Sequence, residues 1–253
     1  MRQRNSYSRI IQDPASWSSE SKGAKIQLFQ HCIEKDITSF LINTQKGSYD
    51  HSLGTAFGES GLSRDEIQFI ARLDSYRDEE KIVEQVEEIL QFLDTDYLDL
   101  LFLDFSLQAD ILLSTIQRLR ARGKIVEIGV LEDKPGDQTR FLKDFPASAT
   151  LSTFSFSPAA IKTLTLAKEG PEETTQMLIL ESGNWENEHE ELRKVADKYQ
   201  VRPKELLFSW LLHHTGHFHP VVHGNFEAVI DSAVKAFHTK LIEEDFQKLP
   251  EKL

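Results

Sequence analysis

Five histidines crowd a short stretch near the end of the chain, at His213, His214, His217, His219 and His223. Imidazole nitrogens are good ligands for zinc and nickel, and two or three of them can hold an ion. His217, His219 and His223 share one parity along a predicted strand, so they would project to one side of it. No acidic pattern that would orient the rings is evident, and a solvated helix end and loop is the simpler interpretation. A metal site in the 213–223 region is kept as an alternative.

Opposite charges follow two neighbouring predicted strands. Arg72 comes directly after an apolar run at 67–71, and Asp104 comes directly after another at 97–103. Since the carboxyl ends of adjacent parallel strands meet at one edge, we expect Arg72 and Asp104 to form an ion pair there. A two-pronged contact between guanidinium and carboxylate satisfies buried charge well. The alternative is an anion site built on Arg72, with Lys46 as a second cation.

The elements that would position these residues alternate along the whole chain, because apolar runs typical of strands are followed by runs with helical period. The predicted strands cover residues 8–11, 38–42, 67–71, 97–103, 125–130, 150–156, 177–180 and 218–222. The predicted helices cover 24–35, a short segment ending near 58, 78–93, 109–122, 138–145, 188–199, 203–213, 227–237 and 243–249. Short connections of this kind make the strands parallel, since parallel neighbours need a crossover. Eight such units predict an α/β fold, a single-domain (β/α)8 or TIM barrel spanning residues 1–253.

Composition excludes several classes of function. The chain has 253 residues, the usual size for such a barrel, and a net charge of −12, which disfavours nucleic acid and anionic membranes. Its one cysteine, Cys32, cannot form an internal disulfide and falls on the apolar face of the helix predicted at 24–35. No apolar run is long enough to span a bilayer, and the first residues lack the apolar core of a signal peptide. We therefore expect a cytoplasmic protein.

Several segments, in the same order along the chain, resemble the aldo-keto reductase family, NADPH-dependent barrel enzymes that reduce carbonyls to alcohols. The most specific is Thr95-Asp-Tyr-Leu-Asp-Leu-Leu101, which resembles the family's strand-four signature. Gly123-Lys-Ile-Val-Glu-Ile-Gly-Val130, Leu53-Gly-Thr-Ala-Phe57 and Glu205-Leu-Leu-Phe-Ser-Trp-Leu-Leu212 are similar to other family segments. The resemblance covers nearly the whole chain and implies the same barrel fold.

The family's catalytic set is Asp, Tyr, Lys and His, and the resemblance places other residues at all four positions. Leu41 stands where the family has Asp, and Lys46, or Thr44 if two residues are deleted, stands where it has Tyr. Arg72 replaces Lys and Asp104 replaces His. Tyr49, the nearest tyrosine, is eight residues beyond Leu41 and is interpreted as a packing residue. A hydrocarbon and a carboxylate cannot supply the proton and donors that hydride transfer to a carbonyl requires.

The positions that hold NADPH in the family are also changed. After the first strand, Asp13-Pro14 stands where the family has Gly-Thr. The resemblance places the other cofactor positions at Leu131, Glu132, Ser152, Thr153, His223, Gly224, Asn225 and Phe226. None of the residues near 225–228 is basic, as the 2′-phosphate would require. Asp13, Glu132, Glu181 and Asp104 are expected to follow strands at the barrel mouth, where negative charge would repel the phosphates of a cofactor. No cofactor is therefore predicted.

The hypothesis that follows is a degenerate aldo-keto reductase, a pseudoenzyme that binds an unidentified small molecule or protein partner. The first alternative is an active NAD(P)H-dependent oxidoreductase with a rearranged site, using Tyr49, Lys46 or new chemistry at Arg72 and Asp104. The second is the metal-binding protein described above.

Overall fold

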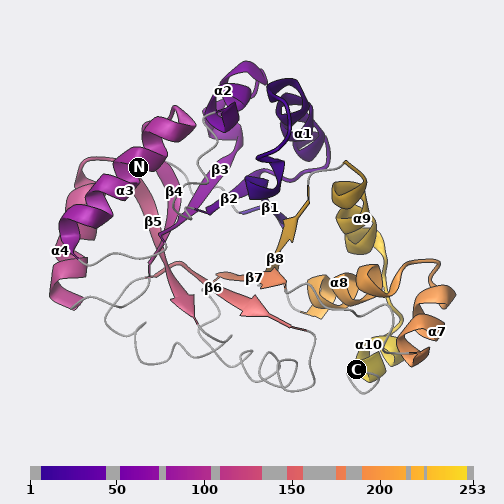
Figure 1. Ribbon diagram of the computed structural model, residues 1–253. Coiled ribbons are helices and arrows are strands. Elements are labelled where there is room, and N and C mark those ends of the chain that lie inside the picture. The colour runs from indigo at the N-terminus through magenta and orange to yellow at the C-terminus, as the bar shows by residue number, and fades with distance from the viewer. Residues whose placement is uncertain are drawn as a thin grey trace.

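Eight parallel strands close into a barrel in the computed structural model, each paired with its neighbours in sequence order and the first paired with the last. The structure describes residues 7–43, 52–73, 78–103, 109–132, 147–155, 175–180, 190–214, 218–224 and 227–249. The strands are β1 (Ile11–Asp13), β2 (Ser39–Asn43), β3 (Gln68–Arg72), β4 (Leu98–Leu103), β5 (Ile125–Glu132), β6 (Ala149–Phe154), β7 (Thr175–Leu180) and β8 (Phe218–His223). The predicted (β/α)8 barrel is thereby confirmed (Figure 1).

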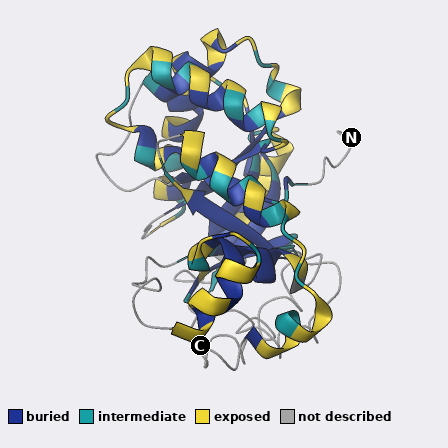
Figure 2. Ribbon diagram, turned by 90° about the vertical axis from the view of Figure 1, so that its right-hand side faces the viewer, coloured by how far each residue is buried: buried dark blue, intermediate teal, exposed yellow. Residues whose placement is uncertain are grey.

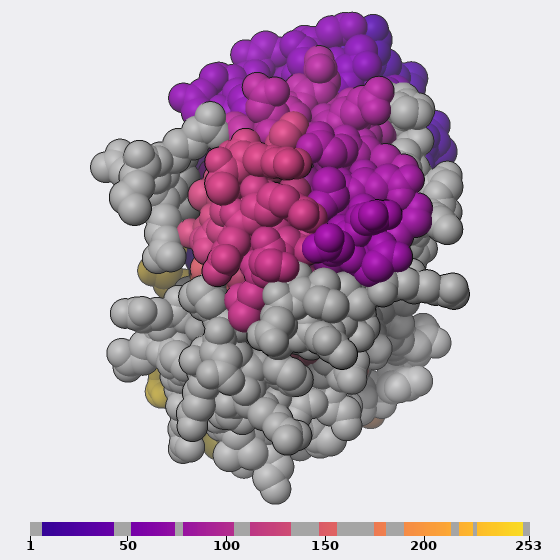
Figure 3. Space-filling model, turned by 90° about the vertical axis from the view of Figure 1, so that its left-hand side faces the viewer, coloured from indigo at the N-terminus to yellow at the C-terminus, as the bar shows by residue number. Residues whose placement is uncertain are grey.

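The described helices pack on the outside of the barrel. They are α1 (Lys22–Glu34), α2 (Ser52–Glu59), α3 (Glu79–Leu93), α4 (Ala109–Ala121), α7 (Glu190–Lys198), α8 (Pro203–His214), α9 (Glu227–His238) and α10 (Glu243–Lys248), with short 3-10 turns η1 (Pro14–Trp17) and η2 (Arg64–Glu66). Of these, α8 is buried along most of its length. The strands are buried, and the helices expose their outer faces (Figure 2). Side by side, α3 and α4 cover one flank of the molecule (Figure 3).

Local signals explain where two of these helices begin and end. The side chain of Asp78 accepts a hydrogen bond from the backbone N–H of Lys81, so Asp78 caps the start of α3 as predicted. Beyond α4 the chain turns at Gly123, whose φ of +70° is a left-handed conformation that glycine adopts without strain. The helix predicted at 138–145 lies outside the described residues.

The first strand differs from its prediction, because β1 starts at Ile11 rather than at residue 8. Ser8 replaces ladder bonds with side-chain bonds: its N–H donates to Ser39 Oγ at 2.9 Å and its Oγ donates to the Ile10 carbonyl at 2.6 Å. Arg9 then turns outward and donates to the carbonyls of Leu212 and Phe218. This stretch ties β1 to β2 and to the end of α8, and only the last three residues join the sheet.

An apolar cluster fills the barrel and separates its two ends. The barrel-interior cluster contains Ile11, Leu41, Ile70, Leu100, Phe102, Ala149, Leu151, Met177 and Val221. Phe102 crosses to β5, where a Cβ on Gly129 would meet its ring at 2.3 Å, so only glycine fits there. The strand ends beyond this layer form the mouth, which is where barrel enzymes place their chemistry.

No helix among the described residues combines the length and the apolar character that crossing a membrane requires.

Candidate functional site

Two of the four positions that the resemblance assigns to catalysis lie within the described residues, Leu41 on β2 and Arg72 at the end of β3. Leu41 is 2% exposed and belongs to the barrel-interior cluster, packed among hydrocarbon side chains. Arg72 has the same strand parity as Ile70, so it points inward at the mouth, where it is in register with Asn43 and Phe102. The predicted partner Asp104 lies outside the described residues, as do Lys46, Thr44 and Tyr49. The ion pair between Arg72 and Asp104 therefore stays a prediction.

The exits of β1 and β8 meet at the mouth through an acid–imidazole contact. Asp13 and His223 are in register across the seam that closes the barrel. Asp13 Oδ2 lies 3.2 Å from His223 Nδ1, and its Oδ1 accepts the Ala15 N–H at 2.8 Å as the cap of η1. The hydrogen bond to Asp13 raises the pKa of His223, against the smaller lowering effect of burial. Both groups face a cavity, and the Asp13 side chain is 14% exposed while His223 is 65% exposed.

The turn after β8 is bonded to η1 rather than left open. Gly224 donates its N–H to Ser16 Oγ at 3.1 Å, and its carbonyl accepts the Trp17 indole N–H at 2.9 Å and the Gln12 amide at 3.3 Å. Gly224 also lies against α9, since a Cβ there would meet Val229 at 2.6 Å. The one backbone donor described in this turn is thus already satisfied within the protein.

A cavity of about 400 Å³ runs from the mouth across the ends of β7 and β8 and between α8 and α9. We call it the β7–β8 cavity. Its residues are Asp13, Ile179, Leu180, Arg202, Lys204, Glu205, Phe208, Val221, Val222, His223, Val229, Ser232 and Ala233. The volume is in the range of about 300–1,000 Å³ that small-molecule sites occupy. A mainly apolar wall with polar groups at its two ends is the usual composition of such a site.

The outer end of the β7–β8 cavity holds an ordered charge network at the start of α8. Glu205 Oε1 accepts the Arg202 Nε and Nη2 at 3.0 and 2.9 Å, its Oε2 accepts the Arg202 backbone N–H at 2.9 Å, and Ser232 hydroxyl donates to it as well. Burial alone would raise the pKa of Glu205, but the bonds from Ser232 and Arg202 outweigh it and lower that pKa. The sequence analysis missed these residues. A glutamate in the first turn after Arg-Pro was the available signal, since it marks a helix start.

The positions that the resemblance assigns to the cofactor are scattered in burial and direction. Leu131 packs against the barrel-interior cluster, so its neighbour Glu132 faces the other way. Ser152 is buried at 4% exposure, and Thr153 is exposed at the end of β6. His223 and Gly224 make the contacts given above, while Asn225 and Phe226 lie outside the described residues. Of the expected acidic rim, Asp13 is at the mouth, and Glu181 and Asp104 are outside the described residues.

Within the described residues, the histidines of the 213–223 region do not lie close enough together to share a metal ion. His219 and His223 both point inward from β8, but four residues of strand separate them by about 13 Å. His219 Nδ1 bonds the Ser8 carbonyl at 2.8 Å near the opposite end of the barrel, and His213 Nδ1 bonds the Ser209 carbonyl at 2.8 Å on α8. His217 is not described. Among the described residues no group of three His, Cys, Asp or Glu side chains could hold a metal ion.

Cys32 is buried in the cluster between α1 and the barrel, and burial raises the pKa of its thiol. A neutral, inaccessible thiol of this kind is a packing residue, as the sequence predicted.

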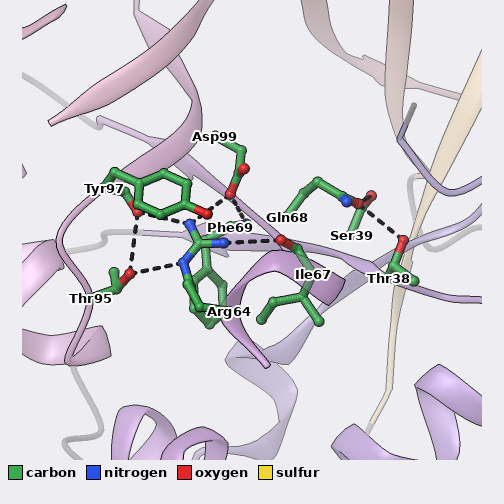
Figure 4. A network of polar contacts seen from close by, with 9 residues as sticks. All are labelled: Thr38, Ser39, Arg64, Ile67, Gln68, Phe69, Thr95, Tyr97 and Asp99. Carbon is green, nitrogen blue, oxygen red and sulfur yellow. Dashed lines mark hydrogen bonds and ion pairs between the residues drawn. The ribbon is translucent and has the colours of Figure 1, made fainter. Parts of the chain in front are cut away.

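A second polar network lies at the other end of the barrel, before β3 and β4 (Figure 4). The Arg64 guanidinium donates to Thr95 Oγ1 at 2.8 Å, to the Tyr97 carbonyl at 2.8 Å and to Asp99 at 2.7 Å. It also lies 3.9 Å above the centre of the Tyr97 ring, and Asp99 accepts the Phe69 N–H at 2.8 Å. The donors and acceptors of this network bond to one another, and the network lies at the end of the barrel opposite the mouth. We therefore interpret it as structural.

A closed parallel barrel with a cavity at the carboxyl ends of β7 and β8 defines the class of this protein as a (β/α)8 barrel with a mouth-side cavity. Solved aldo-keto reductases have similar structures. One from Brucella melitensis has a TM-score of 0.78 and 18% identity, over 98% of this chain and 95% of that chain. A thermostable aldo-keto reductase in complex with the inhibitor epalrestat has a TM-score of 0.81 and 15% identity, over 97% and 95%. One from a Medee basin deep-sea metagenome library has a TM-score of 0.73 and 17% identity, over 96% and 89%.

At these identities the likeness establishes a shared fold. No protein-family model and no curated protein matches the sequence.

Proposed function

We propose that this chain is an aldo-keto reductase by descent that no longer reduces carbonyls with NADPH, and that it acts by binding a small molecule or a protein partner. The observation that carries the proposal is Leu41. It is 2% exposed inside the barrel, in contact with hydrocarbon, at the position where the resemblance requires an ionised aspartate.

Reduction by hydride places a negative charge on the carbonyl oxygen, so a site must offer a proton and fixed donors for that charge. In the family, as the resemblance implies, aspartate holds the lysine that tunes the proton-donating phenol. Leu41 can neither ionise nor accept a hydrogen bond, and Arg72 has a planar fork that does not substitute for a lysine. Loss of one proton-transfer group typically costs about 10²–10⁴-fold in rate, so loss of several ends this mechanism.

The residues present at the β8 exit also fit a phosphate-bearing cofactor poorly. Asp13 presents its carboxylate to the β7–β8 cavity, and the Gly224 N–H is occupied by Ser16. A carboxylate beside several phosphate charges is repulsive, and a donor that is already bonded offers the phosphate no gain over water. Arg202 lies farther out in the cavity and is engaged by Glu205. These contacts support the part of the proposal that the chain does not use NADPH.

Isothermal titration of the purified chain with NADPH and NADP⁺ tests the proposal, beside an active aldo-keto reductase as positive control. We expect no saturable heat from this chain. A screen of aldehydes and ketones should show no oxidation of NADPH above the protein-free rate. Micromolar NADPH binding, or turnover that Arg72→Ala abolishes, would contradict the proposal.

A further inference from the structure

The β7–β8 cavity has two polar ends of different character, joined by an apolar wall. Its middle is formed by side chains from the two strands and the two helices, among them Leu180, Phe208, Val222 and Val229. Phe208 and Val222 are buried at 6% and 8% exposure, whereas Leu180 and Val229 are only partly covered. Apolar surface that is partly exposed within a concave site favours binding in proportion to the area that a ligand removes from water.

The outer end carries a lysine, Lys204, whose charge is not paired within the described part of the chain. Arg202 is neutralised by Glu205, which it contacts at 2.9 Å, so the pair presents little net charge. Lys204 is exposed on the first turn of α8 and has no ion pair or hydrogen bond with any residue in the described ranges. A lysine at a helix N-terminus is also disfavoured by the helix dipole, which favours negative charge there. An anion beside Lys204 would relieve both conditions.

The mouth end offers hydrogen bonds rather than a free charge. Because Asp13 is an acceptor, the 3.2 Å contact places the proton of a neutral His223 ring on Nδ1. Its Nε2 is then an acceptor, or a donor once the ring is protonated, on a side chain that is 65% exposed. A polar or chain-terminal group of a ligand can sit here, whereas a second anionic group would meet the Asp13 carboxylate.

We infer that the β7–β8 cavity binds an elongated apolar monoanion, such as a medium-chain carboxylate, with its anionic group beside Lys204 and its chain against Phe208, Val222 and Val229. The inference rests on the proposed function, because it needs a cavity that NADPH does not occupy. Glu205 is paired with Arg202, and Asp13 is bonded to His223, so among the charged residues that line the cavity Lys204 is the one without such a contact in the described ranges. A ligand with one negative charge and a long apolar body matches that distribution, and a polyanion does not.

The test is isothermal titration of the full chain with decanoate, with decan-1-ol as the uncharged probe of the same length. We expect decanoate to bind saturably. Lys204→Glu should weaken decanoate about tenfold or more, since it replaces an attraction worth up to about fivefold with a repulsion, and should leave decan-1-ol unchanged. Lys240→Glu is the matched control, because Lys240 is an exposed lysine outside the cavity and the change in net charge is the same.

Ala233→Phe provides a second variant that fills the cavity without changing charge. It should abolish binding of both probes, and a cooperative thermal transition would show that the variant is folded. If that variant does not fold, the comparison of Lys204→Glu with Lys240→Glu still decides.

No saturable binding of decanoate by the wild-type chain would overturn the inference, as would equal weakening by Lys204→Glu and Lys240→Glu. NADPH titrated into the same protein separates the two proposals. If the chain binds neither NADPH nor decanoate, only the inference is refuted. If it binds NADPH, the proposed function is refuted.

Discussion

Asp13 Oδ2 and His223 Nδ1 lie 3.2 Å apart across the seam that closes the barrel, although 210 positions separate them in the sequence. Their strands pair in register at these same two residues. The contact joins the first and last strands at the mouth and holds the His223 imidazole at the edge of the β7–β8 cavity. The titration of the His223 ring in this contact can be measured.

His223 should titrate above the ordinary histidine pKa, and Asp13→Asn should lower that pKa because the charged acceptor is removed. Since the folded pKa is raised, the contribution to stability is fully present below the unfolded value and is lost as pH rises through the folded pKa. NMR titration of the His223 ring proton measures the shift. Asp231→Asn is the control, because Asp231 contacts His31 and not His223. An unchanged His223 titration in Asp13→Asn would refute the assignment.

Leu41 should contribute to stability as a packed core residue. Leu41→Ala leaves a cavity in the barrel-interior cluster and should lower the free energy of unfolding by about 3 kcal/mol. Ile242→Ala is the comparison, since Ile242 is 50% exposed and its truncation should stay within about 0.5 kcal/mol. Urea unfolding of the two variants measures the difference. Equal effects would mean that Leu41 is not buried as described.

Phe102 and Gly129 should behave as a coupled pair. Gly129→Ala puts a methyl group 2.3 Å from the Phe102 ring and should destabilise the fold by about 2 kcal/mol. The smaller side chain in Phe102→Leu makes room, so the double variant should lose less than the sum of the single losses. A double-mutant cycle from thermal unfolding measures this coupling. Strict additivity would contradict the close contact.

Arg64 should hold the amino-terminal ends of β3 and β4 together. Arg64→Ala removes the guanidinium bonds to the Asp99 carboxylate and the Tyr97 carbonyl and should cost about 2 kcal/mol of stability. Arg64→Lys should recover little, because one ammonium cannot reproduce the forked set of bonds. Arg118→Ala is the control, since its contact with Glu79 is 3.7 Å long and exposed. Full recovery by lysine would show that only the charge matters.

Local patterns in the sequence were sufficient for the barrel itself. The apolar run that became β4 and the helical spacing of Ile82, Val86 and Ile89 on α3 each report which face of one element is buried. Gly123 and Asp78 ended and began helices where they were expected to. Such signals depend on residues a few positions apart, so they can be interpreted without knowing the rest of the chain.

The tertiary structure alone decided which distant residues meet. The start of β1, the contact of Asp13 with His223, the network around Arg64 and the β7–β8 cavity with Lys204 at its edge all depend on strand register and on closure of the sheet. A shift of one residue in register would turn each inward side chain outward, and no local pattern at Asp13 indicates that His223 is its neighbour. The order of the helices and strands can therefore be predicted from local patterns in the sequence. The composition of the mouth follows from how the first and last strands pair.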